Sequence, residues 1–276
     1  MSHILLALET SGTRCGIALL QGDRQSASVI LDHHDGTQQH AERLLPMVAG
    51  LLAQANLTQA DIQAVAFGQG PGGFTGLRVA CAVAQGMALA LDIGVIPVGS
   101  LDAIAHDVAR RDRPTVVAVV MDARMGEAYA ALFILAPGKP SGDADAPVVV
   151  QAPVLLAGGD LPAWLQDAEA QAQRVLVEHA YDSTRCAWVV AGDGWAAHAG
   201  QQAPAAPWEI DPVDRPSAHA VARLGVQALI EGKTIDAAHA QPLYVRDKVA
   251  FTTAERAGGL GGNPKAGAHL RSGGQS

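Results

Sequence analysis

Short apolar runs bounded by glycine-rich or polar turns recur along the first third of the chain. The runs at 4–8 and 16–20 are separated by a short polar turn, a pattern that predicts a β-hairpin. A third strand near 26–31 is expected to complete a small meander. Two later runs, at 64–67 and 95–98, are also expected to be strands, and the first leads into a loop with four glycines.

Between these runs, apolar residues recur at helical spacing. Segment 40–55 has one apolar face, and Pro46 inside it removes a backbone donor, so a kink or a helix start is expected near this proline. Segment 74–91 is dense in glycine and alanine, which lets a second helix approach closely. Two more helices are expected at 101–110 and 218–231.

The second half of the chain repeats this organisation after a break at 112–114. The apolar runs 115–121 and 128–135 flank the connector 122–127 and predict a second hairpin, and 188–192 is expected to be another strand. Because both halves open with a hairpin and continue into helices and strands, the sequence predicts a duplicated α/β unit.

The expected domains are therefore 1–111 and 112–217, both of α/β class. Helix 218–231 is expected to pack back on the first domain. Segment 254–276 is glycine-rich and polar with nothing to bury, which predicts a disordered tail.

The composition limits the function classes. Of the 276 residues, 49% are hydrophobic and 17% charged, enough for real cores, while the net charge of −8 disfavours a protein that binds nucleic acid unaided. Three separated cysteines make no CxxC pair, so no disulfide framework is expected. Without a basic, then apolar, leader or a long uninterrupted apolar stretch, we expect a cytoplasmic protein with no membrane contact.

The candidate chemistry lies in two loops. Hydroxyls and glycines there predict a phosphate-binding or nucleotide-binding site, although an ordinary turn and a close approach of two backbones explain the same residues. The candidate residues are Thr10, Ser11, Gly12, Thr13, Gly70, Gly72 and Gly73.

Catalytic signatures are missing from the sequence. It has no GxxxxGK[ST] loop, no GxSxG elbow and no two histidines four residues apart, so we expect no catalytic residue and no metal site. Asp122 and Glu127 flank the second hairpin and are expected to cap it or pair with Arg124 rather than work as an acid/base pair. Arg78 is expected to contact an anion or partner carboxylate, or to form a surface ion pair.

Six motifs together resemble the TsaB (YeaZ) family, bacterial subunits of the machinery for tRNA threonylcarbamoyladenosine biosynthesis and paralogues of TsaD. The resemblance spans most of the chain but leaves out the tail and 136–180. The motifs are ILLALETS at 4–11, HAERLLPMV at 40–48, GQGPGGFTGLRVA at 68–80, VIPVGSLDAIA at 95–105, MDARMGEAYAA at 121–131 and PLYVRDKVAFTT at 242–253.

This resemblance implies an actin-like, Hsp70-like or sugar-kinase (ASKHA) fold with two related α/β domains. It also implies a non-catalytic subunit, since the paralogue TsaD carries a metal-binding histidine pair just after the strand matching 95–98, where this chain has none at 99–104. The implied partners are a TsaD-like transferase, a TsaE-like ATPase and, only through the complex, tRNA.

In the family, helices matching 40–55 and 74–91 contact TsaD, and the chain alone is expected to form a homodimer by the same surface. No cofactor is expected, except a nucleotide at a shared interface. The expected partner interface consists of Leu44, Leu45, Val48, Leu51, Leu52, Arg78 and Cys81, although from the residues alone the four leucines and Val48 are most simply explained as core.

Two other functions compete with this one. A stand-alone actin-fold ATPase or small-molecule kinase would use 10–13 and 70–73 as phosphate loops. A metallopeptidase is the weakest alternative, because the histidine spacing for a metal is missing.

Overall fold

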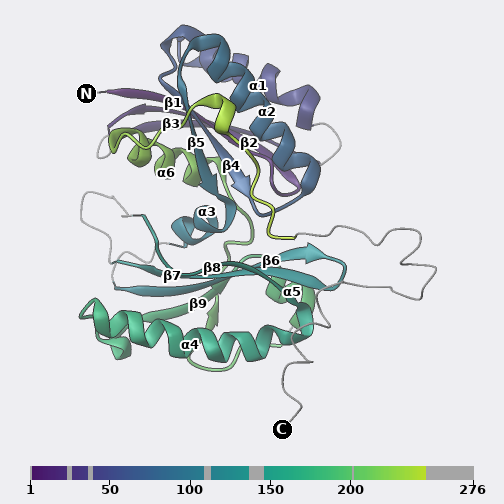
Figure 1. Cartoon of the computed structure of the whole chain (residues 1–276), viewed down its shortest axis with the longest axis vertical. Helices are drawn as coiled ribbons and strands as arrows, with labels where there is room; N and C mark the ends of the chain where they lie inside the picture. The colour runs from purple at the N-terminus through teal and green to yellow at the C-terminus, as the bar shows by residue number, and fades with distance from the viewer. Residues whose placement is uncertain are drawn as a thin grey trace, which may run out of the picture.

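The computed structural model describes residues 2–23, 27–36, 40–108, 113–136, 146–200 and 202–246. Two five-stranded sheets lie one above the other, with helices on their outer faces and further helices on the side of the first sheet that faces the second (Figure 1). We call each sheet with its covering helices a lobe. The tail expected at 254–276 lies outside the described residues.

The first lobe is built on an antiparallel meander extended by two parallel strands. Its strand order is β3-β2-β1-β4-β5, with β4 parallel to β1 and to β5. The strands are β1 His3–Glu9, β2 Arg14–Gly22, β3 Ser28–Asp35, β4 Ala64–Gly70 and β5 Gly94–Gly99.

The second lobe repeats this topology. Its order, read from the far edge, is β8-β7-β6-β9-β10, again an antiparallel meander followed by two parallel strands. Each strand therefore has a counterpart in the first lobe, which confirms the duplicated unit and the two-domain actin-like fold. The strands are β6 Thr115–Arg124, β7 Glu127–Leu135, β8 Val148–Ala157, β9 Ala187–Ala191 and β10 Glu209–Ile210.

Successive side chains of a strand point to opposite faces of the sheet, and in the first sheet both faces are apolar. Leu6 and Leu8 of β1 face the core beneath α1 (His40–Gln54) and α2 (Phe74–Leu91). Leu5 and Ala7 face the opposite core, which is covered by α6 (Ala218–Ile230). The helix predicted at 218–231 therefore packs on the first sheet, although it follows the second sheet in sequence.

The second sheet is covered in the same way. Helices α4 (Leu161–Glu178) and α5 (Gly194–Ala199) lie on its outer face. Helix α3 (Ser100–Asp107) lies between the lobes, where Leu101 and Ile104 enter the core of the inner face.

Several predicted elements differ from the observed ones. Helix α1 begins at His40 and runs through Pro46, so the proline does not mark its start. Helix α3 ends at Asp107 rather than 110, and residues 109–112 lie outside the description. The sequence pattern did not predict β8 or α4. The limits 1–111 and 112–217 stay a prediction.

Helix α2 is long and apolar enough to cross a bilayer, judged by length and composition and only over the part of the chain described. In the structure it packs on the first sheet, with Leu77, Ala80 and Ala84 buried against β4 and its neighbours. Its apolar composition therefore serves, at least on this face, the core of the first lobe.

The start of α2 requires glycine at position 76. A Cβ there would overlap the carbonyl oxygen of Thr10 in the β1–β2 turn. The Thr10 hydroxyl donates to the Gly76 carbonyl at 2.7 Å, so the turn and the helix are joined at one point. Only a residue without a side chain allows this approach.

We expect Gly76→Ala to lower the free energy of unfolding by about 3 kcal/mol, because the turn and α2 must separate to admit the methyl group. Gly86→Ala is the matched control, since the same helix leaves open space at Gly86, and it should stabilise by about 0.5–1 kcal/mol. Urea unfolding measures both. A Gly76→Ala protein as stable as the wild type would show that the contact is not a constraint.

Candidate functional site: the cleft between the lobes

Equivalent turns of the two lobes face each other across a cleft with a cavity of about 280 Å³. The β1–β2 turn and the loop before α2 line one side. The β6–β7 turn and the loop before α5 line the other, because the duplicated topology brings the counterpart segments together. Residues 214–216, before α6, complete the wall.

The structure brings most of the predicted phosphate-binding residues to this cleft. Ser11, Gly12, Thr13, Gly72 and Gly73 all line it. Whether they hold a nucleotide stays a prediction.

The other two predicted residues lie elsewhere. Thr10 is fully buried and bonded to Gly76, so it presents no hydroxyl to a ligand. Gly70, with φ of +112°, faces the C-terminal segment, where a Cβ would lie 2.9 Å from the carbonyl oxygen of Leu243. The structure therefore corrects the assignment of Thr10 and Gly70 to a phosphate site.

Internal hydrogen bonds engage the backbone amides that would cradle a phosphate. The Ser11 N–H donates to Glu9 Oε1 at 2.6 Å, and the Gly73 N–H donates to the Ser11 carbonyl at 2.7 Å. A Cβ on Gly72 would lie 2.7 Å from both the carbonyl oxygen and the Cβ of Ser11. Of the two explanations left open by the sequence, the close approach of two backbones accounts for Gly72.

Glu9 is a buried carboxyl group behind these loops, with 3% of its surface exposed. It lies against Gly68, where a Cβ would overlap the carboxylate. Burial raises the pKa of Glu9, and the hydrogen bond from the Ser11 N–H offsets part of this rise. Because it is closed off from the cleft, Glu9 holds the loops in place rather than reaching a substrate.

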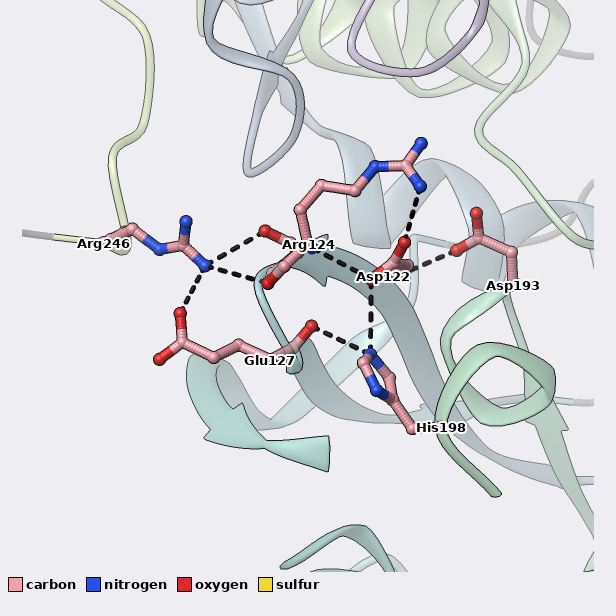
Figure 2. Close-up of polar contacts among 7 residues, drawn as sticks. Asp122, Arg124, Glu127, Asp193, His198 and Arg246 are labelled. Carbon is pink, nitrogen blue, oxygen red and sulfur yellow. Dashed lines mark hydrogen bonds and ion pairs between the residues drawn. The ribbon is translucent and has the colours of Figure 1, made fainter. Parts of the chain in front are cut away.

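The second lobe contributes a charged network to the cleft (Figure 2). Asp122 pairs with Arg124 at 2.9 Å, which confirms the salt bridge expected from the sequence, and Asp122 Oδ1 lies 3.3 Å from His198 Nε2. The Asp122 N–H donates to Asp193 Oδ1 at 2.9 Å. Burial raises the pKa of Asp193. Glu127 pairs with Arg246 instead of Arg124.

The charges of the cleft do not favour an added anion. Arg124 is paired with Asp122, and Arg215 forms two hydrogen bonds of 2.7 and 2.8 Å with Asp214. Among the described lining residues these are the two cations, while Asp122, Asp193 and Asp214 are the carboxylates. Phosphate binding depends on free cations or free amides, and in this cleft both arginines and the Ser11 and Gly73 amides are engaged internally.

Residues 99–104, which match the position of the histidine pair implied for the paralogue, offer no set of metal ligands. Ser100 and Ile104, at the start of α3, are fully buried. Over the described ranges, no group of three His, Cys, Asp or Glu side chains is placed to hold a metal ion.

The predicted partner interface divides into buried and exposed residues. The buried ones belong to the first lobe's own core and cannot present a surface, which corrects their assignment: Leu44, Val48, Leu51, Leu52 and Cys81. Leu45 is 52% exposed. Arg78 is also exposed, but it stacks 3.8 Å from the centroid of the Phe74 ring and donates to the Tyr244 hydroxyl at 2.9 Å.

Sequence reasoning missed Asp193, His198, Arg215 and Arg246. The signal for Asp193 is present in the chain, because Gly192 and Gly194 follow β9 as the glycine-rich loop follows β4. The correspondence between the loops after β9 and β4 can be recognised once the strand order of the second sheet is known. Arg246 lies in a quoted motif, but no local pattern connects it to Glu127, 119 residues away.

Comparisons with known proteins agree on one family. A family model described as TsaD, tRNA N6-adenosine threonylcarbamoyltransferase, matches residues 34–252. The chain is similar to the tRNA threonylcarbamoyladenosine biosynthesis protein TsaB of Escherichia coli K12, with 29% identity over 90% of this chain and 96% of the relative. TsaB of Haemophilus influenzae is 39% identical over 45% of this chain and 51% of its own length.

Two solved structures from Pseudomonas aeruginosa are similar over 88% of this chain. One is YeaZ, with a TM-score of 0.67 and 30% identity, covering 99% of that chain. The other, a protein with similarity to peptidase YEAZ, has a TM-score of 0.68 and 31% identity, covering 100% of that chain.

We expect Glu9→Gln to change the pH dependence of stability. A carboxyl group whose pKa is raised on folding binds more protons in the folded state, so stability falls as pH rises from the ordinary glutamate pKa to the raised one. The free energy of unfolding of the glutamine variant should not show this fall. Above the raised pKa, the variant should exceed the wild type by about 1.4 kcal/mol for each unit by which folding raises the Glu9 pKa. Urea unfolding between pH 4 and pH 8 (roughly the range in which carboxyl groups titrate) measures it, and parallel curves for the two proteins would contradict the role of Glu9.

Proposed function

This chain belongs to the TsaD family, in its TsaB (YeaZ) group, and we propose that it is the non-catalytic partner subunit for tRNA threonylcarbamoyladenosine biosynthesis. In this role it binds and activates a TsaD-like transferase that modifies the tRNA adenosine next to the anticodon. Membership of the family supports participation in this biosynthesis. The role as a non-catalytic subunit is the more specific part of the proposal and needs its own argument.

The single observation that carries the accessory role is the state of the cleft. The actin-like frame is complete, but the Ser11 and Gly73 amides and both cleft arginines are engaged within the chain. A phosphoryl or acyl transferase needs free donors or a cation where charge develops on the substrate. The arrangement favours a protein that works through its surface.

The partners of the proposal follow the family. We propose a TsaD-like transferase as the direct partner, a TsaE-like ATPase joining the pair, and tRNA contacted only through the complex, in the cytoplasm. The net charge of −8 supports the indirect route to tRNA, because phosphate neutralisation requires basic surface.

In this proposal the partner docks on the helix pair α1 and α2. In the absence of the partner, the same surface forms a homodimer. Exposed apolar side chains lie on it: Leu45 is 52% exposed, Leu89 80% and Phe74 46%. The buried leucines of α1 then act as the support beneath this surface rather than as contact residues. Apolar exposure on a packed helix pair is typical of an interaction site.

We expect Leu45→Asp to weaken capture of the TsaD-like partner at least about tenfold, since a charge in an apolar contact is costly. Val177→Asp, at a 76% exposed position of α4 in the other lobe, is the matched control and should bind normally. Titration of the purified partner measures both, with circular dichroism as a folding check. Unchanged binding by a folded Leu45→Asp protein would exclude this residue from the interface.

A reconstituted modification assay tests the accessory role itself. The TsaD-like partner should form threonylcarbamoyladenosine in tRNA faster with this chain than without it. The chain alone should form none. Formation of the modified nucleoside by this chain without the partner would overturn the proposal.

Calorimetry tests the competing ATPase function. The purified chain alone should give no heat of binding with ATP and magnesium, because the loop amides and arginines are engaged internally. Binding together with turnover by the chain alone would favour the stand-alone ATPase or kinase.

A further inference from the structure

The last described residues of the chain pass from one lobe to the other. We call residues 241–246 the strap. Figure 1 shows the chain descending from the first lobe toward the second on the right of the view, while α3 lies on the left. The chain therefore passes between the lobes at three described places: at α3, at residues 211–217 between β10 and α6, and at the strap.

The first end of the strap is bound to β4. The Gln69 side chain donates to the Gln241 carbonyl at 3.1 Å, and the Leu243 N–H donates to the Gln69 carbonyl at 2.8 Å. Tyr244 then packs on Phe74, with ring centroids 5.7 Å apart, and accepts the hydrogen bond from Arg78. This half of the strap belongs to the first lobe.

The second end is bound to the β6–β7 turn. Val245 packs against the core of the second sheet's inner face. The Arg246 guanidinium donates to the Glu127 carboxylate, to the Ala123 carbonyl at 3.0 Å and to the Arg124 carbonyl at 3.4 Å (Figure 2). The Arg246 and Glu127 side chains are only 14% and 5% exposed.

The bonds of Arg246 reach a turn that forms one wall of the cleft. Ala123 and Arg124 line the cavity, and Arg124 and Met125 both adopt positive φ, at 64° and 58°. Such a backbone persists only where surrounding contacts hold it. The Arg246 guanidinium supplies contacts of that kind, from a segment anchored in the opposite lobe.

We propose that the strap is a latch that sets the separation of the lobes and hence the width of the cleft. The Arg246–Glu127 pair holds the strap to the second lobe, and Gln69 holds it to the first. A buried ion pair is stable only while both partners are present, so losing one charge expels the other from the site. Release of Arg246 frees the strap from the second lobe, and the lobes then move apart about the two remaining connections, α3 and residues 211–217. The latch is a property of the free chain and does not depend on the partner proposed above.

The test is Arg246→Gln in the full chain, with spin labels at Ile230→Cys at the end of α6 in the first lobe and Val177→Cys in the second, both outside the α1/α2 surface. The three native cysteines are buried, which favours labelling at the two exposed positions. Pulsed electron spin resonance should show the interlobe distance distribution broadened and shifted to longer distances. Hydrogen exchange at the Leu243 amide should rise by about tenfold or more, because release at one end loosens the other.

Arg124→Gln is the matched control. Arg124 lies in the same turn and is paired with Asp122, but its side chain does not contact the strap, so both readouts should stay as in the wild type. If Arg246→Gln does not fold, the double variant Glu127→Gln with Arg246→Gln removes both buried charges and should show the same broadening. An unchanged distance distribution in either folded variant, or equal broadening in Arg124→Gln, would overturn the latch.

Discussion

The contact between the β1–β2 turn and the start of α2 is the constraint on which the rest of the structure depends. Gly73 donates to the Ser11 carbonyl, and Gly76 lies so close to Thr10 that no side chain fits between them. This contact positions the first lobe's wall of the cleft and closes Glu9 into the interior. A loop composition suited to a phosphate is thus used to join two segments of the same chain.

The two copies of the duplicated unit hold their hairpin turns at the cleft by different interactions. In the first lobe, glycines and backbone hydrogen bonds hold the turn. In the second, charged side chains do so, through Asp122, Arg124 and Asp193 around the turn and Arg246 behind it. A close backbone contact requires glycine in place of a side chain, whereas the strength of a charged contact depends on its burial and on the presence of both partners.

This difference bears on function. A nucleotide site in such a cleft needs donors from both lobes pointing at one ligand. Here the Ser11 and Gly73 amides of the first lobe point into their own loops, while Arg124 and Arg215 are paired with the neighbouring carboxylates Asp122 and Asp214. Exposed apolar side chains such as Leu45 and Leu89 lie on α1 and α2, outside the cleft lining, and this favours association over turnover.

The sequence by itself determined the local elements. Helix Phe74–Leu91 was predicted with its bounds, because glycines precede it and small residues fill it, and the hairpin at 122–127 followed from apolar runs around a polar turn. Periodicity also identified the apolar face of α1, but could not tell whether the face meets its own sheet or a partner. Helix α4 was missed although its buried residues recur at helical spacing, among them Leu161, Leu165 and Ala172.

Only the tertiary structure decided which residues meet. It buried Leu44 and Leu52 while leaving Leu45 exposed, and it brought Arg246 to Glu127, 119 positions earlier in the chain. Periodicity and turn chemistry report interactions between near neighbours, whereas the cleft and the strap arise where two sheets and a distant segment converge. The docking of those sheets depends on the total packing of both lobes, which no short stretch of sequence encodes.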